Sequence, residues 1–168
     1  MIVKLRTWEY EYASHIGIRR FTANWNKQDA SYYDKTKMED NRTAQVAAAI
    51  GELAVAKATN QYWHASIWDE SSHDENKYIP DVGKSVEVRR VRTQDGPVVR
   101  EKDLIKNDLL NNNLYIFGVK PIGPEFREVE ILGWTRAIHG WHNGIPTPFG
   151  KVIPQSMLSP VETWQTPR

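Results

Sequence analysis

Two acidic residues and an arginine lie around one tight turn, and their spacing suits the binding of a hard divalent cation. Asp81 comes just before the turn at Gly83, and Glu87 and Arg89 follow it. We expect Asp81 to end one strand and Glu87 to lie just past the turn on the next, so that the two carboxylates approach each other. Magnesium prefers such oxygen ligands, and one or two carboxylates can hold it while water fills the other positions.

The arginine adds a positive charge to this arrangement. Side chains alternate along a strand, so Arg89 points the same way as Glu87, about 7 Å further along. A bound cation can polarise a phosphate and lower the pKa of a water, and a neighbouring arginine can stabilise charge that builds at the phosphorus. The set therefore indicates hydrolysis of a phosphodiester. A second interpretation stays open, because Glu-x-Arg on a strand is also typical of a solvated face with a cross-strand ion pair.

A third carboxylate, Glu52, lies within an apolar helical run at positions 46–58. A lone carboxylate there is costly unless it faces solvent or a partner, which makes Glu52 a further candidate for the ionic site. The alternative is an exposed stripe on which Gln45 and Lys57 are its neighbours at helical spacing.

Helices come first in the chain and strands follow them. The pattern predicts a helix from Thr7 to about Lys27, with Thr7 as N-cap, and a second helix that Asp40 or Asn41 caps and Asn60 ends. Strands are expected at 62–68, 85–92, 96–105, 113–121 and 127–136, loops at 28–37, 69–76, 106–113 and 139–150, and an edge strand within 151–158. This order predicts one α+β domain over residues 1–168, helical in 1–60 and sheet-rich in 61–168, with a mixed or antiparallel sheet.

The motifs around these residues are similar to those of a known superfamily. They are Gly51-Glu52-Leu53-Ala54 on the helix, Pro80-Asp81, and Glu87-Val88-Arg89 on the next strand. They resemble the PD-(D/E)XK nucleases, in which a helix with a Glu precedes an Asp and then an acidic residue, any residue and Lys on a strand. Over residues 8 to 160 the layout is similar to that of small phage-type members. The resemblance implies a restriction-endonuclease-like fold, with a central mixed sheet flanked by helices, and metal-dependent hydrolysis of DNA.

The same resemblance implies the roles of the site residues. Asp81 and Glu87 would bind magnesium, or manganese in its place, and Glu52 would be a further ligand, directly or through water. The chain departs from the pattern at Arg89, where the superfamily usually has lysine. Arginine stays protonated, so it can clamp a phosphate but is a poor base. Lys84 in the turn or Lys102 further along are alternatives for the lysine role.

Because Arg89 stands where the superfamily usually has lysine, functions other than a nuclease stay open. One is a catalytically inactive nucleic-acid-binding or phage-associated accessory protein that retains the fold. Another is a structural protein in which the acidic residues form a salt-bridge network with Arg89, and Arg100 with Asp103 is a further charged pair of that kind.

The net charge of +1 requires that any nucleic-acid contact come from a local basic patch. The candidates for contact with DNA, with RNA not excluded, are Arg90, Arg92, Lys84, Arg100, Lys102, Arg19 and Arg20. Alternation places Arg90 on the face opposite Arg89, so the cluster can reach a ligand only in part. A homodimer is a further expectation, because cleavage of two strands often uses two sites.

Composition excludes several other classes of protein. The chain has no cysteine, which rules out disulfides, thiolate zinc sites and a cysteine nucleophile. No run of about 18 apolar residues is present, and the N-terminus becomes charged too early for a signal peptide, so we expect no membrane partner. The expected location is the cytoplasm, or that of the host if a phage encodes the chain. His139 and His142 have no carboxylate at the spacing of a known zinc motif.

Overall fold

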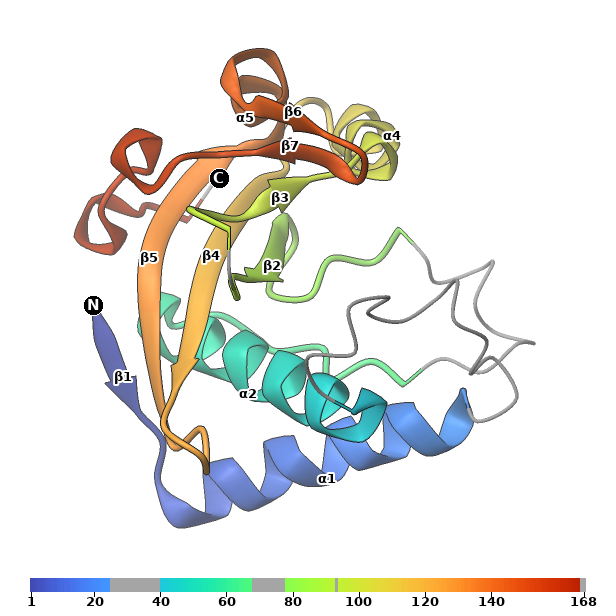
Figure 1. Cartoon of the computed structure of the whole chain (residues 1–168), viewed down its shortest axis with the longest axis vertical. Coiled ribbons are helices and arrows are strands. Elements are labelled where there is room, and N and C mark those ends of the chain that lie inside the picture. The colour runs from blue at the N-terminus through green and yellow to red at the C-terminus, as the bar shows by residue number, and fades with distance from the viewer. Residues whose placement is uncertain (25–39, 68–77, 93, 167–168) are drawn as a thin grey trace.

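A four-stranded mixed sheet forms the centre of the computed structural model, which describes residues 1–24, 40–67, 78–92 and 94–166. The strands lie in the order β1 (Ile2–Lys4), β5 (Glu128–Arg136), β4 (Tyr115–Ile122) and β2 (Val86–Arg90). β1, β5 and β4 are antiparallel neighbours, whereas β2 runs parallel to β4 (Figure 1). The α+β class and the mixed sheet flanked by helices are confirmed.

Of the two long helices, α2 (Asn41–Thr59) covers one face of this sheet, and α1 (Thr7–Ala23) packs against α2 (Figure 1). α2 begins and ends as predicted. The carboxylate of Asp40 accepts from the backbone N–H of Thr43 at 2.8 Å, and Asn60 takes the left-handed conformation that ends many helices.

The first helix begins at Thr7 as predicted, but its N-cap and its C-terminal end differ from the prediction. Arg6 is the N-cap instead of Thr7, because the carboxylate of Glu9 accepts from the Arg6 N–H at 2.6 Å. The helix ends at Ala23, where the Asn24 side chain donates to the carbonyl of Arg20. The predicted last turn, 25–27, and the predicted loops at 28–37 and 69–76 lie outside the described residues.

Small residues allow α2 to pack closely on both sides. A Cβ added at Gly17 of α1 would lie 2.7 Å from the backbone nitrogen of Val46, and one added at Gly51 would lie 2.8 Å from a methyl group of Val119. α2 therefore lies close against α1 and against β4. Fully buried side chains from α2 and the strands fill the core between these layers, among them Ile50, Val55, Phe117, Val119 and Ile131.

A smaller layer covers the other end of the sheet. It holds α4 (Glu101–Leu109), α5 (Ala137–Asn143) and a three-stranded antiparallel sheet in the order β3 (Val98–Val99), β7 (Gly150–Val152), β6 (Ile145–Thr147). Its own apolar cluster contains Val99, Leu114, Ile116, Ala137 and Ile153. Two single-turn 3-10 helices, η2 (Gln155–Met157) and η3 (Val161–Thr163), follow near the C-terminal end.

The structure corrects the element predictions mainly in this second layer. The expected strand at 96–105 is only the two residues of β3, after which the chain turns into α4 and absorbs much of the expected loop at 106–113. The carboxylate of Asp103 accepts from the Arg100 N–H at 2.8 Å and so starts this helix. The expected loop at 139–150 contains α5 and β6.

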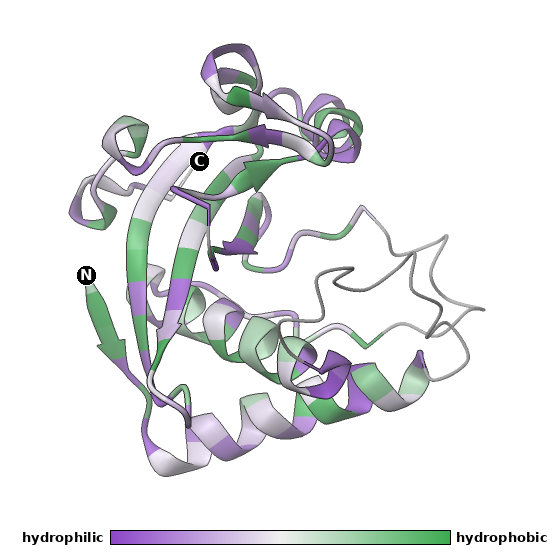
Figure 2. Cartoon of the chain, viewed as in Figure 1, coloured by the Kyte–Doolittle hydropathy of each residue, from purple (hydrophilic) through white to green (hydrophobic). Residues whose placement is uncertain are grey.

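Two further strand predictions are wrong. The expected strand at 62–68 is a single bridge between Trp63 and Val82 within its described part, 62–67. The stretch 151–158 does not lie at a sheet edge, since β7 is the central strand of its sheet and η2 follows. Among the helices that the structure describes, none has the length and apolar character that crossing a membrane requires (Figure 2).

Candidate functional site

The turn before β2 brings Asp81 back onto the strand that carries Glu87 and Arg89. Val82 and Val86 pair in an antiparallel bridge, which closes the turn tightly. One carboxylate oxygen of Asp81, Oδ2, accepts from the backbone N–H of Val88 at 2.8 Å. The predicted approach of Asp81 to β2 is therefore present, and a backbone hydrogen bond holds it in place.

Arg89 connects the acidic side chains of this site. Its Nη1 atom lies 2.9 Å from Glu87 Oε2 and 3.9 Å from Asp81 Oδ2, and its Nη2 atom lies 2.5 Å from Asp103 Oδ1. Asp103 is buried on α4, so the arginine joins β2 to that helix. The prediction that Glu87 and Arg89 share one face of the strand is confirmed by this contact. Asp103 also accepts from the backbone N–H of Arg100, through its other carboxylate oxygen.

Lys106 is a site residue that the sequence prediction missed. Its ammonium group binds Glu87 Oε1 and donates to the carbonyl of Ile79 at 3.2 Å, and only 7% of the residue is exposed. Asp103 and Lys106 are three apart, which places both on one face of a helix. That signal was hidden because residues 96–105 had been predicted as a strand and 106–113 as a loop.

Glu52 lies on α2 and faces inward, but its carboxylate is already paired with the guanidinium of Arg20. Arg20 of α1 donates to both carboxylate oxygens, at 2.7 and 2.8 Å, and Trp63 donates its indole N–H to Oε2 at 2.9 Å. Arg20 also donates through Nε to the carbonyl of Ser66 at 2.7 Å. This buried pair fixes α1 to α2, and it explains how an apolar helical run carries a carboxylate.

The three carboxylates act on one another electrostatically. Burial raises the pKa of Asp81, and the charge of Glu52 raises it further, against the pull of Arg89. Burial also raises the pKa of Glu87, with the charge of Asp81 as the next cause. Desolvation works to lower the pKa of Arg89, but the charges of Asp103, Glu87 and Asp81 outweigh it and raise that pKa, so the guanidinium stays protonated.

Lys102 lies at the edge of the same cluster, one residue before Asp103. Desolvation lowers the pKa of its ammonium group, and the positive charges of Arg89 and Arg100 lower it further. A lysine in such surroundings gives up its proton more readily than an ordinary lysine.

Asp81 and Glu87 offer the oxygen donors that a magnesium ion requires. Oδ1 of Asp81 accepts no hydrogen bond from the described residues, and about a quarter of the Asp81 side chain, 26%, is exposed. Both oxygens of Glu87 are paired, so a cation would have to displace Arg89 or Lys106 from one of them. Two carboxylates are sufficient when waters and phosphate complete the shell of a magnesium ion. Glu52 fits less well, since both of its oxygens bind Arg20.

A larger protein cage for a metal is not present in the part of the chain that the structure describes. No group of three or more His, Asp or Glu side chains there has an arrangement that could hold an ion. The predicted three-carboxylate site is therefore not assembled, and the ligand role of Glu52 stays a prediction. A two-carboxylate site is the arrangement that fits the structure.

The predicted nucleic-acid contacts divide into two groups. Arg20 is mostly buried against Glu52, and Arg90 lies over the ring of Phe126 at 5.6 Å, on the face away from Arg89 as predicted. The other five residues are exposed: Arg19, Lys84, Arg92, Arg100 and Lys102.

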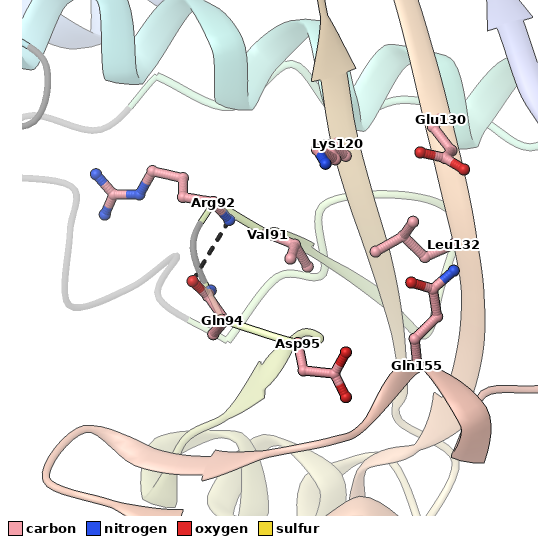
Figure 3. A pocket seen from close by; sticks show the side chains of 8 residues that line it. All are labelled: Val91, Arg92, Gln94, Asp95, Lys120, Glu130, Leu132 and Gln155. Carbon is pink, nitrogen blue, oxygen red and sulfur yellow. Dashed lines mark hydrogen bonds between the residues drawn. The ribbon is translucent and has the colours of Figure 1, made fainter.

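One cavity of about 360 Å³ lies beyond the end of β2 (Figure 3). Its lining includes acidic and basic side chains from three parts of the chain, with Asp95, Lys120 and Glu130 among them. Neither Asp81 nor Glu87 lines it, so the ionic cluster of β2 and α4 lies outside this cavity.

Comparison of the chain with protein-family models, with curated proteins and with solved structures found no match.

Proposed function

We propose that the chain is a metal-dependent nuclease that hydrolyses DNA phosphodiester bonds on a restriction-endonuclease-like core. The observation that carries the proposal is the meeting of Asp81, Glu87 and Arg89 on one side of β2, where the motif resemblance requires them. The mixed sheet with α2 on one face agrees with the fold that the resemblance implies. The two carboxylates have raised pKa values and lie next to fixed cations, an arrangement common at catalytic sites.

Asp81 and Glu87 are the residues that would hold magnesium, or manganese in its place. The chemistry that such an ion supplies when bound is polarisation of a phosphate oxygen and a lower pKa for a water in contact with it. The backbone N–H of Val88 keeps one oxygen of Asp81 in position and leaves the other free for a ligand. The buried Arg89 and Lys106 hold the carboxylate of Glu87 at a fixed place on β2.

The cations of the site have separate tasks in this proposal. Arg89 is permanently charged, and its contacts with Asp103 and Glu87 orient its fork, so it stabilises negative charge on the phosphate oxygens. Its Nε atom is buried and has no hydrogen-bond partner among the described residues. Lys102, with its lowered pKa, is the better candidate for accepting a proton, and Lys106 positions Glu87.

Cleavage assays with isosteric variants test this function. Plasmid, linear and branched DNA are incubated with magnesium, manganese or EDTA, using wild type, Asp81→Asn and Glu87→Gln. Both variants remove one negative charge and keep the shape of the side chain. We expect wild type to cleave with either metal and both variants to lose at least a hundredfold in rate. Glu125→Gln is the matched control, because Glu125 is an exposed carboxylate outside the site.

Each outcome has a defined meaning for the proposal. Cleavage that persists in both variants, or in EDTA, would refute the assignment of the site. Loss of cleavage in Glu125→Gln as well would point to a general effect on the protein. Circular dichroism of every variant separates loss of the site from loss of the fold.

A second candidate is a nucleic-acid-binding protein that retains the fold without catalysis. The observation in its favour is the pairing of the carboxylates with cations of the chain itself: Glu52 with Arg20, and Glu87 with Arg89 and Lys106. DNA binding without cleavage in either metal, together with no change in thermal stability on addition of magnesium, would support this candidate over the nuclease.

A further inference from the structure

The hairpin of β6 and β7 presents an aromatic side chain to solvent at its tip. The two-residue turn is Pro148-Phe149, and 71% of Phe149 is exposed. Among the described residues this is one of the most exposed large apolar side chains of the chain. A ring that is so exposed contributes little to folding.

The turn that carries Phe149 is held rigidly. The hydroxyl of Thr147 donates to the carbonyl of Gly150 at 2.9 Å and accepts from the N–H of Phe149 at 3.3 Å. Proline before Phe149 restricts the backbone further. Gly150 has a φ of +134°, and a Cβ there would overlap the carbonyl oxygen of Val99, so the tip rests directly on β3. A ring held in this way loses little conformational freedom on binding.

This hairpin is connected to the proposed site through β3 and α4. β7 pairs with β3 through Lys151 and Val99. The residue after Val99 is Arg100, the N-cap of α4, and α4 carries Asp103 and Lys106 of the ionic cluster. Figure 1 shows the β6–β7 turn close to β3 and α4.

The surroundings of the tip are basic. Arg100 and Lys102 are exposed at the start of α4, and Lys151 lies 5.0 Å from the ring centre of Trp141. Glu101 is the one exposed acidic side chain in this stretch of α4. Positive charge beside an exposed aromatic ring suits a strand with phosphates and accessible bases.

We propose that Phe149 is a stacking platform for an unpaired base of DNA, and that the preferred substrate has a single-stranded segment. The inference rests on the proposed nuclease function for the choice of DNA as ligand. In a duplex the bases are already stacked on one another, so the ring of Phe149 finds no free base face on which to stack. Where a strand is single or frayed, the ring stacks on a base while Arg100 contacts a phosphate and guides the strand toward α4 and β2.

Binding measured in EDTA tests this subsite without cleavage. Fluorescence anisotropy is recorded with one labelled sequence as single strand, as fork with an unpaired tail and as blunt duplex. We expect Phe149→Ala to weaken binding of the single strand and fork about tenfold, as one stacked base would, and binding of the duplex less than twofold. Phe149→Trp should restore affinity, and a tail of abasic sites should abolish the difference between wild type and Phe149→Ala.

Trp8→Ala is the matched control, since Trp8 is also an exposed aromatic, 61%, in the first turn of α1 and outside the second layer. Equal affinity of wild type and Phe149→Ala for all three DNAs would overturn the inference and leave the nuclease proposal standing. Equal losses with single strand and duplex would also overturn it, because stacking on an unpaired base predicts a difference. If Phe149→Ala weakens binding of single-stranded DNA but the protein never cleaves DNA, the stacking proposal stands and the nuclease proposal is refuted. Absence of any DNA binding would overturn this inference, while the cleavage assay decides the function separately.

Discussion

Removal of Arg20 is expected to destabilise the protein strongly, because it leaves Glu52 as a buried charge. The guanidinium makes two hydrogen bonds to this carboxylate, at 2.7 and 2.8 Å, and the two side chains are only 13% and 9% exposed. Breaking a buried pair from one side costs about 3–5 kcal/mol, whereas an exposed pair contributes at most about 1 kcal/mol. For Arg20→Met we expect about 3 kcal/mol, since Trp63 still donates to Glu52.

Urea denaturation and thermal unfolding of wild type and variants measure this effect. A loss of about 3 kcal/mol corresponds to a fall in Tm of about 6–12 °C for a chain of this size. Arg20→Met combined with Glu52→Gln should lose only about 1 kcal/mol, because the uncompensated charge is gone. The adjacent Arg19 is exposed, so Arg19→Met should change the free energy of unfolding by less than about 0.5 kcal/mol.

Two results would refute this reasoning. One is a loss below about 1 kcal/mol in Arg20→Met, which would mean that the pair is solvated like an exposed one. The other is additivity of the single substitutions in the double variant, which would mean that Arg20 and Glu52 do not act on each other.

Three further predictions concern the site and the packing of α2. Burial and the charge of Glu52 raise the pKa of Asp81, so ionisation of Asp81 destabilises the fold as the pH rises through that pKa. Asp81→Asn should therefore raise the Tm at pH 7 to 8. The gain should vanish at pH 3, where Asp81 is protonated in both the folded and the unfolded state. Magnesium should raise the Tm of wild type, and at a hundred times its Kd it should stabilise the folded state by about 2.7 kcal/mol. The effect should be larger at pH 8 than at pH 5, because the carboxylates must be ionised to bind the ion. The Tm of Asp81→Asn should not change on addition of magnesium. Gly17→Ala should lower the free energy of unfolding, measured by urea denaturation, by about 1–3 kcal/mol, because the added Cβ meets the backbone of Val46. Gly51→Ala should lower it less, because its added Cβ meets a side-chain methyl group of Val119, which can move. Equal losses in the two variants would contradict this packing.

Local signals in the sequence were sufficient for the elements with strong caps or regular alternation. Asp40 and Asn60 mark both ends of α2, β5 lies within its predicted range, and β4 extends one residue beyond its own, to Ile122. These signals failed in 96–105, where a two-residue strand is followed at once by a helix. The apolar pair of β3 extended the strand prediction into α4, whose start depends on the carboxylate of Asp103. That error concealed Lys106.

The sequence by itself determined which residues form the centre of the site. Asp81, Glu87 and Arg89 are at most eight positions apart, and a tight turn followed by alternation brings them together without help from distant parts of the chain. Only the tertiary structure decided their partners. Arg20, Asp103 and Lys106 come from other helices, and packing of those helices determines which cation meets which carboxylate. Burial raises the energetic cost of any unpaired charge, so these distant partners determine the charge state and accessibility of the site.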